Sequence, residues 1–404
     1  MSKDNFAKIK YTEKFSKKYP IVKDCKINNI SSKCTETEKT LYKIEKVELF
    51  FNRRQKYLIK KWIDLYRKTY NKAIKIAKKH NEYNFYRLRK MVQPFYDENN
   101  RKRIGMGKNT LDGAVKDVCV AYKSAKAKLE AGNIKKFRLR PKKKCSNKET
   151  IVIGHGAFSN KSTKKRRNSF AYRKLGEIKS SVPFIDNTRE ARLTFDKRRN
   201  KFYLFIVKET RVFKVDDRQK ECSLDPGLRM FQTCYDKKKC FSFGENIKGF
   251  VEPILKKIDR IANFQNKFWY KKYTQRLRDK IRNKIDNIHW NICKILVTRY
   301  NEITIGKLST KIVSKKGFMT KMNKRLYYAL SHYTFRQRLK FKCQEYGVKF
   351  NEQNESYTTK KCGGCGKLNE VGTAKVFNCV FCDFTWGRDQ NGARNIMIRK
   401  DLGL

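Results

Sequence analysis

Two Cys-x-x-Cys pairs near the C-terminus are the residues of this chain best suited to chemistry. The first pair is Cys362 and Cys365, and the second is Cys379 and Cys382. Each pair can bring two thiolates to one ion from a tight turn, and two such turns complete a tetrahedral zinc site. No histidine lies nearby. Four thiolates leave no open position, so we expect a structural zinc. The alternative is two chance pairs of buried cysteines.

Two aspartates lie at the ends of predicted strands or helices, where they could bind a metal ion. Asp225 ends an apolar strand at a Pro-Gly turn, and Asp389 begins the predicted C-terminal helix. Two-metal hydrolysis of a phosphodiester needs carboxylates from separate elements, and Mg²⁺ prefers such hard oxygen ligands. Ala393 and Ile396 lie one and two turns beyond Asp389, which predicts that this helical face packs on a sheet. Each aspartate also has a purely structural interpretation, Asp225 as a turn residue and Asp389 as a helix cap.

The charge of the chain indicates a polyanionic partner. Its 404 residues include 99 Lys and Arg against 38 Asp and Glu, and 39% of them are hydrophobic. This length allows two or three domains with a sizeable core. The formal net charge of +61 is spread along the chain, which favours RNA or DNA binding at several surfaces. A membrane surface is the rival partner, but no long apolar span or signal peptide appears, so we expect no membrane association.

The cysteines outside the two pairs indicate the compartment. The chain has 13 cysteines, and those outside the pairs are scattered singly. Because the paired spacing fits metal better than disulfides, we expect a reducing, intracellular compartment. That compartment would be the nucleus for a eukaryotic host or a virus of eukaryotes, and the cytoplasm or nucleoid otherwise.

The first third of the chain predicts an arm, a strand and two helices. Residues 1–46 are polar and basic, and Lys46–Phe51 is typical of a strand. Apolar residues recur at helical spacing from Arg53 to about Lys79 and from Thr110 to Leu129. The polar faces of both helices are strongly basic. We favour contact with a nucleic-acid backbone over simple solvation.

The pattern then changes to short strands. Alternating apolar and basic residues predict a small β-barrel or sheet between Phe137 and Val215. The predicted strands are 137–140, 150–154, 191–195 and 201–209. The basic run Lys161–Arg167 is a loop between strands, and a nuclear localisation signal is the alternative interpretation.

The rest of the chain alternates strands with helices. This order predicts an α/β multidomain protein with a mixed sheet flanked by helices. The predicted elements are a strand–turn–strand at Cys222–Tyr235, a helical region at Ile254–Tyr300, a strand at Glu302–Leu308, a helix at Lys324–Tyr346, a strand at Val348–Phe350 and a terminal helix.

Four runs of residues together carry a family resemblance. They resemble the RuvC-type nuclease of TnpB proteins, and most of all that of Fanzor proteins, the eukaryotic and viral relatives. The runs are Leu224–Gly227, Ile303–Leu308, Tyr357–Cys362 with the two cysteine pairs, and Arg388–Ile396. Val47–Ala73 and Thr110–Lys123 resemble the front half of the same family, with less specific motifs.

The resemblance implies an RNA-guided DNA endonuclease. A guide RNA of the omega type would pair with one strand of double-stranded DNA, and the protein would read a short flanking motif. A single RuvC site would cut both strands, and a monomer on one RNA is the simplest assembly. The implied domains are a basic N-terminal arm (1–46), a wedge-like β-barrel (47–51 and 133–217), a helical recognition domain (52–132), an RNase H-like (RuvC) nuclease (218–359 and 384–404) and a zinc ribbon (360–383).

One position departs from the family pattern. Most TnpB proteins carry the middle catalytic glutamate where this chain has Gly306. Either the enzyme is inactive, or another acid has taken this role. Glu355 is the best replacement, Glu352 is the next choice and Glu302 a distant third. The plain alternative for Glu355 is a solvent-exposed loop carboxylate.

Three hypotheses follow for the whole chain. We favour a nuclease in which Asp225, Glu355 and Asp389 bind catalytic Mg²⁺, or Mn²⁺, beside the structural zinc. The second hypothesis is a catalytically inactive RNA-guided DNA-binding protein. The third is a basic zinc-ribbon protein that binds RNA only, and it leaves the motifs around Asp225 and Asp389 unexplained.

Overall fold

The chain forms two compact units. The computed structural model describes residues 36–144, 146–158, 168–184, 189–213, 218–308, 319–372 and 374–403. One unit is Tyr42–Thr210, and the other is Arg211–Leu404 together with Met1–Leu41. The predicted wedge-like barrel and recognition domain thus fall mainly in one unit, and the predicted nuclease and zinc ribbon in the other. The finer domain boundaries stay predictions. Most of the predicted basic arm, and all of Lys161–Arg167, lie outside the described residues.

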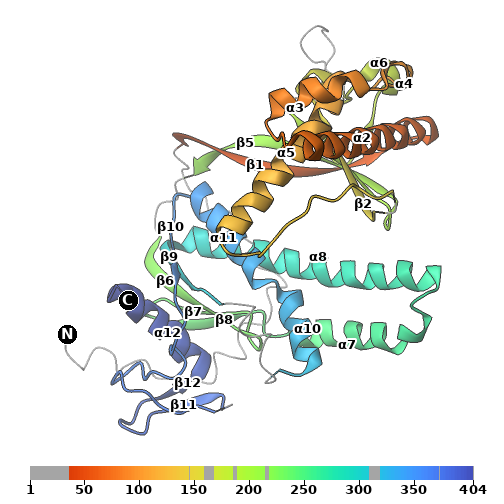
Figure 1. The fold of residues 1–404 in the computed structure, drawn as a ribbon. Coiled ribbons are helices and arrows are strands. Elements are labelled where there is room, and N and C mark those ends of the chain that lie inside the picture. The colour runs from red at the N-terminus through yellow and green to blue at the C-terminus, as the bar shows by residue number, and fades with distance from the viewer. Residues whose placement is uncertain are drawn as a thin grey trace. The chain divides into compact units, whose positions relative to one another are not determined.

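The Tyr42–Thr210 unit packs helices against a five-stranded sheet of order β2-β4-β5-β1-β3 (Figure 1). Trp62, Leu111 and Leu193 are among the buried residues of its one shared core. Its elements are β1 (Glu36–Phe50), α2 (Arg53–His80), α3 (Phe85–Val92), η2 (Gln93–Phe95), α4 (Glu98–Ile104), α5 (Lys108–Glu130), β2 (Lys148–Ile153), η3 (His155–Ala157), α6 (Tyr172–Leu175), β3 (Lys179–Ser180), β4 (Ala191–Asp196) and β5 (Lys201–Phe213).

The long helices α2 and α5 confirm the two helices predicted here. A capping box fixes the start of α2, because the Asn52 side chain accepts from the Gln55 N–H and the Gln55 side chain accepts from the Asn52 N–H. The strand predicted at Lys46–Phe51 begins earlier, at Glu36. The strand predicted at 137–140 is wrong: these residues have no partner strand, and Phe137 packs edge-on against the Tyr122 ring. Among the described strands, β2 and β3 form the two edges of the sheet and do not pair with each other. Closure of the sheet into a barrel therefore stays a prediction.

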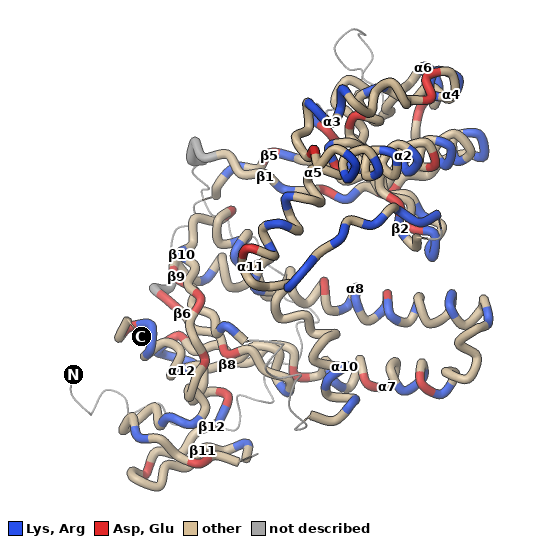
Figure 2. The backbone as a smooth tube through the Cα atoms, in the orientation of Figure 1, with Lys and Arg blue, Asp and Glu red and all other residues tan. Residues whose placement is uncertain are grey.

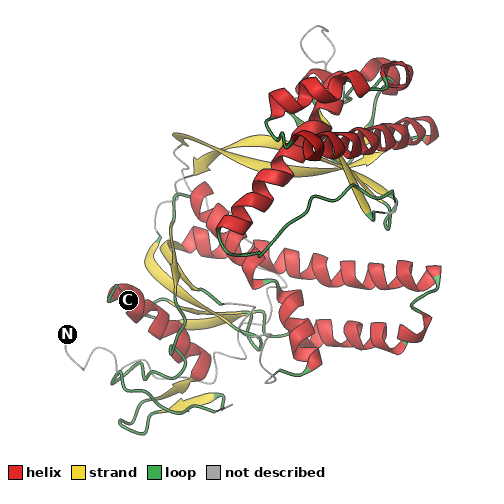
Figure 3. Cartoon of the chain, viewed as in Figure 1, coloured by secondary structure: helices red, strands yellow, loops and turns green. Residues whose placement is uncertain are grey.

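The second unit is built on a mixed sheet of order β10-β9-β6-β7-β8. Strands β10, β9 and β6 are parallel, and β6, β7 and β8 are antiparallel (Figure 3). Its elements are β6 (Gln219–Pro226), β7 (Gln232–Tyr235), β8 (Cys240–Phe243), α7 (Ile247–Arg260), η4 (Ala262–Phe264), α8 (Phe268–Arg299), β9 (Tyr300–Gly306), α10 (Lys321–Leu330), α11 (His332–Glu345), β10 (Lys349–Gln353), β11 (Val376–Asn378), β12 (Thr385–Gly387) and α12 (Arg388–Asp401).

Side chains of β6 alternate between two packed faces of this sheet. Cys222 and Leu224 join the core formed with α7, α8, α10 and α11. Ser223 faces the other side, where its hydroxyl donates to the Ala393 carbonyl of α12 at 2.7 Å. Because side chains two apart share a face, Asp225 lies on the α12 side with Ser223. Ala393 and Ile396 are fully buried, which confirms that this face of the terminal helix packs inward.

Two of the predicted helices are each interrupted. The region predicted at Ile254–Tyr300 consists of α7 and α8, separated by a short 3-10 turn. The helix predicted at Lys324–Tyr346 breaks at Ser331, whose φ of 51° lies in the left-handed region and cannot continue an α-helix. No described helix combines the length and apolar character that crossing a bilayer requires.

Candidate metal centre

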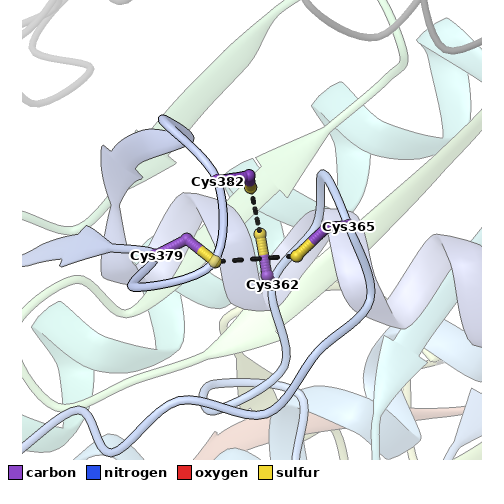
Figure 4. A group of neighbouring side chains, drawn as sticks. All are labelled: Cys362, Cys365, Cys379 and Cys382. Atoms are coloured by element: carbon purple, nitrogen blue, oxygen red, sulfur yellow. Dashed lines mark hydrogen bonds between the residues drawn. The ribbon is translucent and has the colours of Figure 1, made fainter.

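The four paired cysteines lie together in space. Their sulfurs are all within 4.8 Å of one another, and they come from two facing loops (Figure 4). The Cys362 and Cys382 sulfurs are 3.8 Å apart, and those of Cys365 and Cys379 are 3.6 Å apart. A tetrahedral zinc with Zn–S bonds of about 2.3 Å places its sulfurs about 3.8 Å apart. The cluster therefore fits zinc, and the alternative of unrelated buried cysteines is wrong.

Burial raises the pKa of the Cys362 thiol to about 12, whereas polar groups favour the thiolate at Cys379. The Gly364 N–H donates to the Cys362 sulfur at 3.3 Å, and the Phe381 N–H donates to the Cys379 sulfur at 3.4 Å. Burial alone would raise the pKa of the Cys379 thiol. Hydrogen bonds from Phe381 and neighbouring side chains outweigh burial and lower this pKa to about 6. A thiol that ionises this readily is a suitable metal ligand.

Two asparagines of α12 tie the cysteine loop to the helix. The Asn391 side chain accepts from the Gly363 N–H at 2.9 Å and donates to the Lys361 carbonyl at 2.9 Å. Asn395 donates to the carbonyls of Thr358 and Lys361. A Cβ at residue 363 would lie 2.8 Å from Asn391 Oδ1, so this approach requires glycine. Sequence reasoning missed both asparagines, although their i, i+4 spacing places them on one helical face.

The three predicted carboxylates gather at the carboxyl ends of the parallel strands. Leu224 of β6 pairs with Ile305 of β9, which brings Asp225 beside Gly306. Gln353 of β10 pairs with Gly306 on the other side, and Glu355 follows two residues later. All three acids are half-buried, so each keeps part of its surface exposed.

The Glu355 side chain occupies the space that a residue 306 side chain would fill. A Cβ at position 306 would lie 2.7 Å from both Cγ and Cδ of Glu355, and closer still to Oε1. Glu355 Oε1 is buried and has no hydrogen-bond partner among the described residues. The interpretation of Glu355 as a solvent-exposed loop carboxylate is therefore wrong.

Helix α12 brings Asp389 to the same edge. A Cβ at residue 392 would lie 2.5 Å from Asp225 Oδ2, so the helix passes directly against this carboxylate. The N-cap of α12 is Gly387, which excludes Asp389 as the cap residue. At the other end of the helix, Lys400 forms ion pairs with Glu221 and Glu302, which lie near the starts of strands β6 and β9. Helix α12 is thus fixed at both ends of the sheet.

The two alternative glutamates are engaged elsewhere. Glu302 lies at the opposite end of β9 and accepts from Asn351 at 2.6 Å. Glu352 forms an ion pair with Arg336 of α11 at 3.4 Å. Glu352 is level with Ile305 and Leu224, so its side chain points to the opposite face of the sheet from Asp225.

Burial makes Asp225 and Glu355 hard to ionise without a cation. Burial raises the pKa of Asp225 well above its usual range, and the charges of Glu355 and Asp389 raise it further. Burial raises the pKa of Glu355 to about 7, against the opposing charge of Arg336. Sequence reasoning missed Arg336, which carries no local motif signal.

The donor set fits a hard divalent cation. Three carboxylates, one with an unpartnered buried oxygen, supply the oxygen ligands that Mg²⁺ prefers. Asp225, Glu355 and Asp389 would hold it. Among the described residues, the four cysteines are the only group of three or more His, Cys, Asp or Glu side chains whose ligand atoms all lie within 4.8 Å of one another. The three carboxylates are more widely spaced, so they do not form a closed site for a single ion.

Comparisons with known proteins cover both the cysteines and most of the chain. A family model described as Cas12f1-like, TNB domain matches residues 332–396. A TnpB-like protein of Acanthamoeba polyphaga mimivirus is 28% identical over 418 residues, spanning 95% of this chain and 79% of that protein. Over nearly its whole length the chain is thus similar to TnpB-like proteins, and in its C-terminal part it is similar to Cas12f1. The match at 332–396 includes Glu355, the four cysteines and Asp389, but not Asp225.

The similarity extends to a named nuclease. The CRISPR-associated endodeoxyribonuclease Cas12f1 of Sulfoacidibacillus thermotolerans is 27% identical over 127 residues, spanning 31% of this chain and 29% of that protein. A cryo-EM structure of a Cas12f1-sgRNA-target DNA complex aligns with 17% identity over 89% of this chain and 100% of the other. Its TM-score of 0.35 is too low to carry a structural argument.

We expect the Cys379→Ala variant to lose its metal. Three thiolates leave the tetrahedral set incomplete, and without the ion the cysteine loop loses its main constraint. Elemental analysis should find about one zinc per wild-type chain and close to none in the variant. The Cys119→Ala variant, altered at a buried cysteine of the other unit, should keep its zinc. Normal zinc content in Cys379→Ala would overturn the assignment.

Glu355 should make the metal-free protein less stable as pH rises. Its folded pKa of about 7 exceeds the ordinary value of 4.5. The unfolded chain therefore releases this proton at lower pH than the folded chain does. Between about pH 5 and 8 the thermal midpoint of wild type should fall relative to Glu355→Gln, and added Mg²⁺ should reduce this difference. Parallel pH profiles in metal-free buffer would contradict the assignment.

Proposed function

We propose that this chain is an RNA-guided endonuclease that cuts double-stranded DNA at a single RuvC-type two-metal site. A bound guide RNA selects the target by base pairing, and the protein reads a short flanking DNA motif. The observation that carries the proposal is the position of Glu355. Its carboxyl group fills the space beside Gly306 and lies at the same sheet edge as Asp225.

The electrostatics of this edge favour an active enzyme over the inactive alternative. Half-buried acids with raised pKa values are unfavourable in a fold that does not use them. Asp225 and Glu355 both have raised pKa values. An inactive DNA-binding protein would gain from replacing either acid. Retention of a third acid opposite Gly306 is explained by a cation that it helps to bind.

Each acid has a separate support that sets its position. Strand β6 fixes Asp225, and the first turn of α12 fixes Asp389, whose negative charge suits a helix N-terminus. The asparagine contacts of α12 connect Asp389 to the cysteine loop. Arg336 favours the ionised form of Glu355. Two divalent cations held by these acids would stabilise the attacking and leaving oxygens of the phosphodiester.

Charge and relatives support the proposed partners. A net charge of +61 suits a protein that grips a structured RNA and a heteroduplex, and Lys and Arg are distributed over both units (Figure 2). The named Cas12f1 relative is an endodeoxyribonuclease. The wedge-like barrel, the recognition domain, the structural zinc and a monomer on one RNA belong to this proposal. So does a reducing compartment, which is the nucleus if the host is eukaryotic.

Cleavage of a randomised plasmid library tests the proposal. The protein, purified with its RNA, should cut plasmids that carry the RNA-encoded target, in the presence of Mg²⁺ or Mn²⁺. Alanine at Asp225, Glu355 or Asp389 should abolish cutting, because each substitution removes a cation ligand, while the co-purified RNA is retained.

The matched control is the Gly249→Ala variant, in which the added Cβ meets nothing within 4 Å. Full cutting by the Glu355→Ala variant would contradict the proposal that Glu355 replaces the acid absent at position 306. Specific DNA binding without cutting by wild type would favour the inactive alternative.

Position 306 provides an independent test. Gly306→Ala should lower the cleavage rate about 100-fold, because the added carbon displaces the Glu355 carboxylate. The double variant Gly306→Glu with Glu355→Ala returns an acid to β9 and should recover cutting relative to Glu355→Ala alone. Single-turnover rates at saturating Mg²⁺ measure both effects. An unaffected Gly306→Ala enzyme would show that Glu355 does not need this space.

A further inference from the structure

The α7–α8 hairpin extends beyond the core of its unit. Buried residues end at Ile258 on α7, and continuous burial on α8 starts at Ile281. Across residues 259–280, every one of which the structure describes, Thr274 is the only buried residue. The loop between the helices lies at the end of the hairpin away from the sheet of the same unit (Figure 1). We call residues 260–278 the hairpin tip.

Three large aromatic side chains are exposed on the hairpin tip. Phe268 is 81% exposed, and Phe264 and Trp269 are each 48% exposed. The rings of Phe264 and Trp269 lie 5.4 Å apart and make one tilted pair. Phe268 and Trp269 are adjacent on α8, so their side chains diverge by about 100°. The hairpin tip therefore presents two separate aromatic surfaces, and neither is covered by the described chain.

The aromatic surfaces lie in a wholly basic segment. The hairpin tip holds six Lys and Arg and no Asp or Glu. Arg260, Lys267, Lys271 and Lys272 are exposed and form no ion pair with the described residues. Among the described residues, the ion pairs of α7 and α8 all lie outside the hairpin tip, and they join Glu252 to Lys256, Asp279 to Arg282, Asp259 to Arg325 and Asp286 to Arg338. The first turn of α8 has no acidic residue and no side-chain cap, so its N–H groups are open to an anion.

We propose that the hairpin tip binds unpaired nucleotides of the guide RNA by base stacking. This inference rests on the proposed function. The basic residues and the start of α8 would hold the phosphates, while the Phe264–Trp269 pair and Phe268 each receive a base. Lys is depleted at protein–protein interfaces, and a second copy of so basic a chain would be repelled. The surroundings of the rings therefore favour a polyanion over a protein partner.

Stacking also favours RNA over duplex DNA. A duplex hides the faces of its bases, whereas loops and bulges of a folded RNA expose bases that stack on aromatic rings. The guide RNA is the component of the proposed assembly with such unpaired nucleotides in permanent contact with the protein. Target DNA exposes unpaired bases only after the guide RNA has opened the duplex, so it reaches the hairpin tip later than the guide RNA does.

Paired substitutions at the same position separate stacking from apolar contact. Trp269→Phe and Phe268→Tyr keep a ring, while Trp269→Leu and Phe268→Leu keep apolar bulk without one. The RNA that co-purifies with wild type, sequenced and transcribed in vitro, serves as the probe. Each leucine variant should weaken its binding about fivefold to a hundredfold, and the ring-keeping variants should bind as wild type does. The loss should persist at 0.5 M salt, whereas the effect of Lys271→Gln with Lys272→Gln should shrink.

Ultraviolet crosslinking of the purified ribonucleoprotein identifies the occupant. Mass spectrometry should find RNA nucleotides attached to the peptide that contains Phe268 and Trp269. Leucine variants with wild-type RNA affinity would overturn the inference, as would crosslinks that form only after target DNA is added. Loss of a dimer with RNA affinity unchanged would assign the hairpin tip to self-association instead. If wild type cuts its target in each of these cases, the proposed function stands. If no RNA co-purifies with wild type, both fail.

Discussion

Repulsion between three like charges is the constraint on which the second unit depends. Asp225, Glu355 and Asp389 repel one another when ionised, and burial makes the ionised forms of Asp225 and Glu355 still less favourable. The positive charges of Arg388 and Arg336 oppose this effect only in part, and rigid supports hold the acids in place. Two parallel strands set the spacing of the first two acids by register, and a packed helix delivers the third. The apolar core on the opposite face of the sheet supplies the burial that stabilises this arrangement.

Helix α12 is the part that joins the cysteine cluster to the carboxylates. Its first turn carries Asp389, its middle carries the asparagines that bind the cysteine loop, and its last turn carries Lys400. Gly392 lets it lie against Asp225 without a clash. The cysteine cluster is therefore coupled to the carboxylates through one rigid element. A disturbance of the loop would reach the sheet edge through changes in the position of α12.

The sequence predicted those features that depend on local pattern or spacing. The cysteine cluster followed from two short spacings, and α2, α5 and the strand ending at Asp225 followed from periodicity and turn chemistry. Other features depend on contacts that no local pattern records. The helix breaks at Ser331 because this residue adopts a left-handed backbone conformation, which a serine in the sequence does not predict. Arg336 comes near Glu355 only through the packing of α11. The RNase H-like assignment and the role of Glu355 came from the resemblance, whereas Asp225 and Asp389 are already candidates from their places at the ends of predicted elements.

The fit of Glu355 against Gly306 has a consequence for how such a site can change over generations. A side chain at 306 and the Glu355 carboxyl group claim the same volume. An ancestor with the acid on β9, as the resemblance implies for most of the family, could not add the second acid without a clash and a further like charge. Positions 306 and 355 are thus mutually dependent. A sequence with an acid at both positions would be overcrowded, and a sequence with an acid at neither would lack a metal ligand. Lineages should retain one arrangement or the other, with few sequences in between.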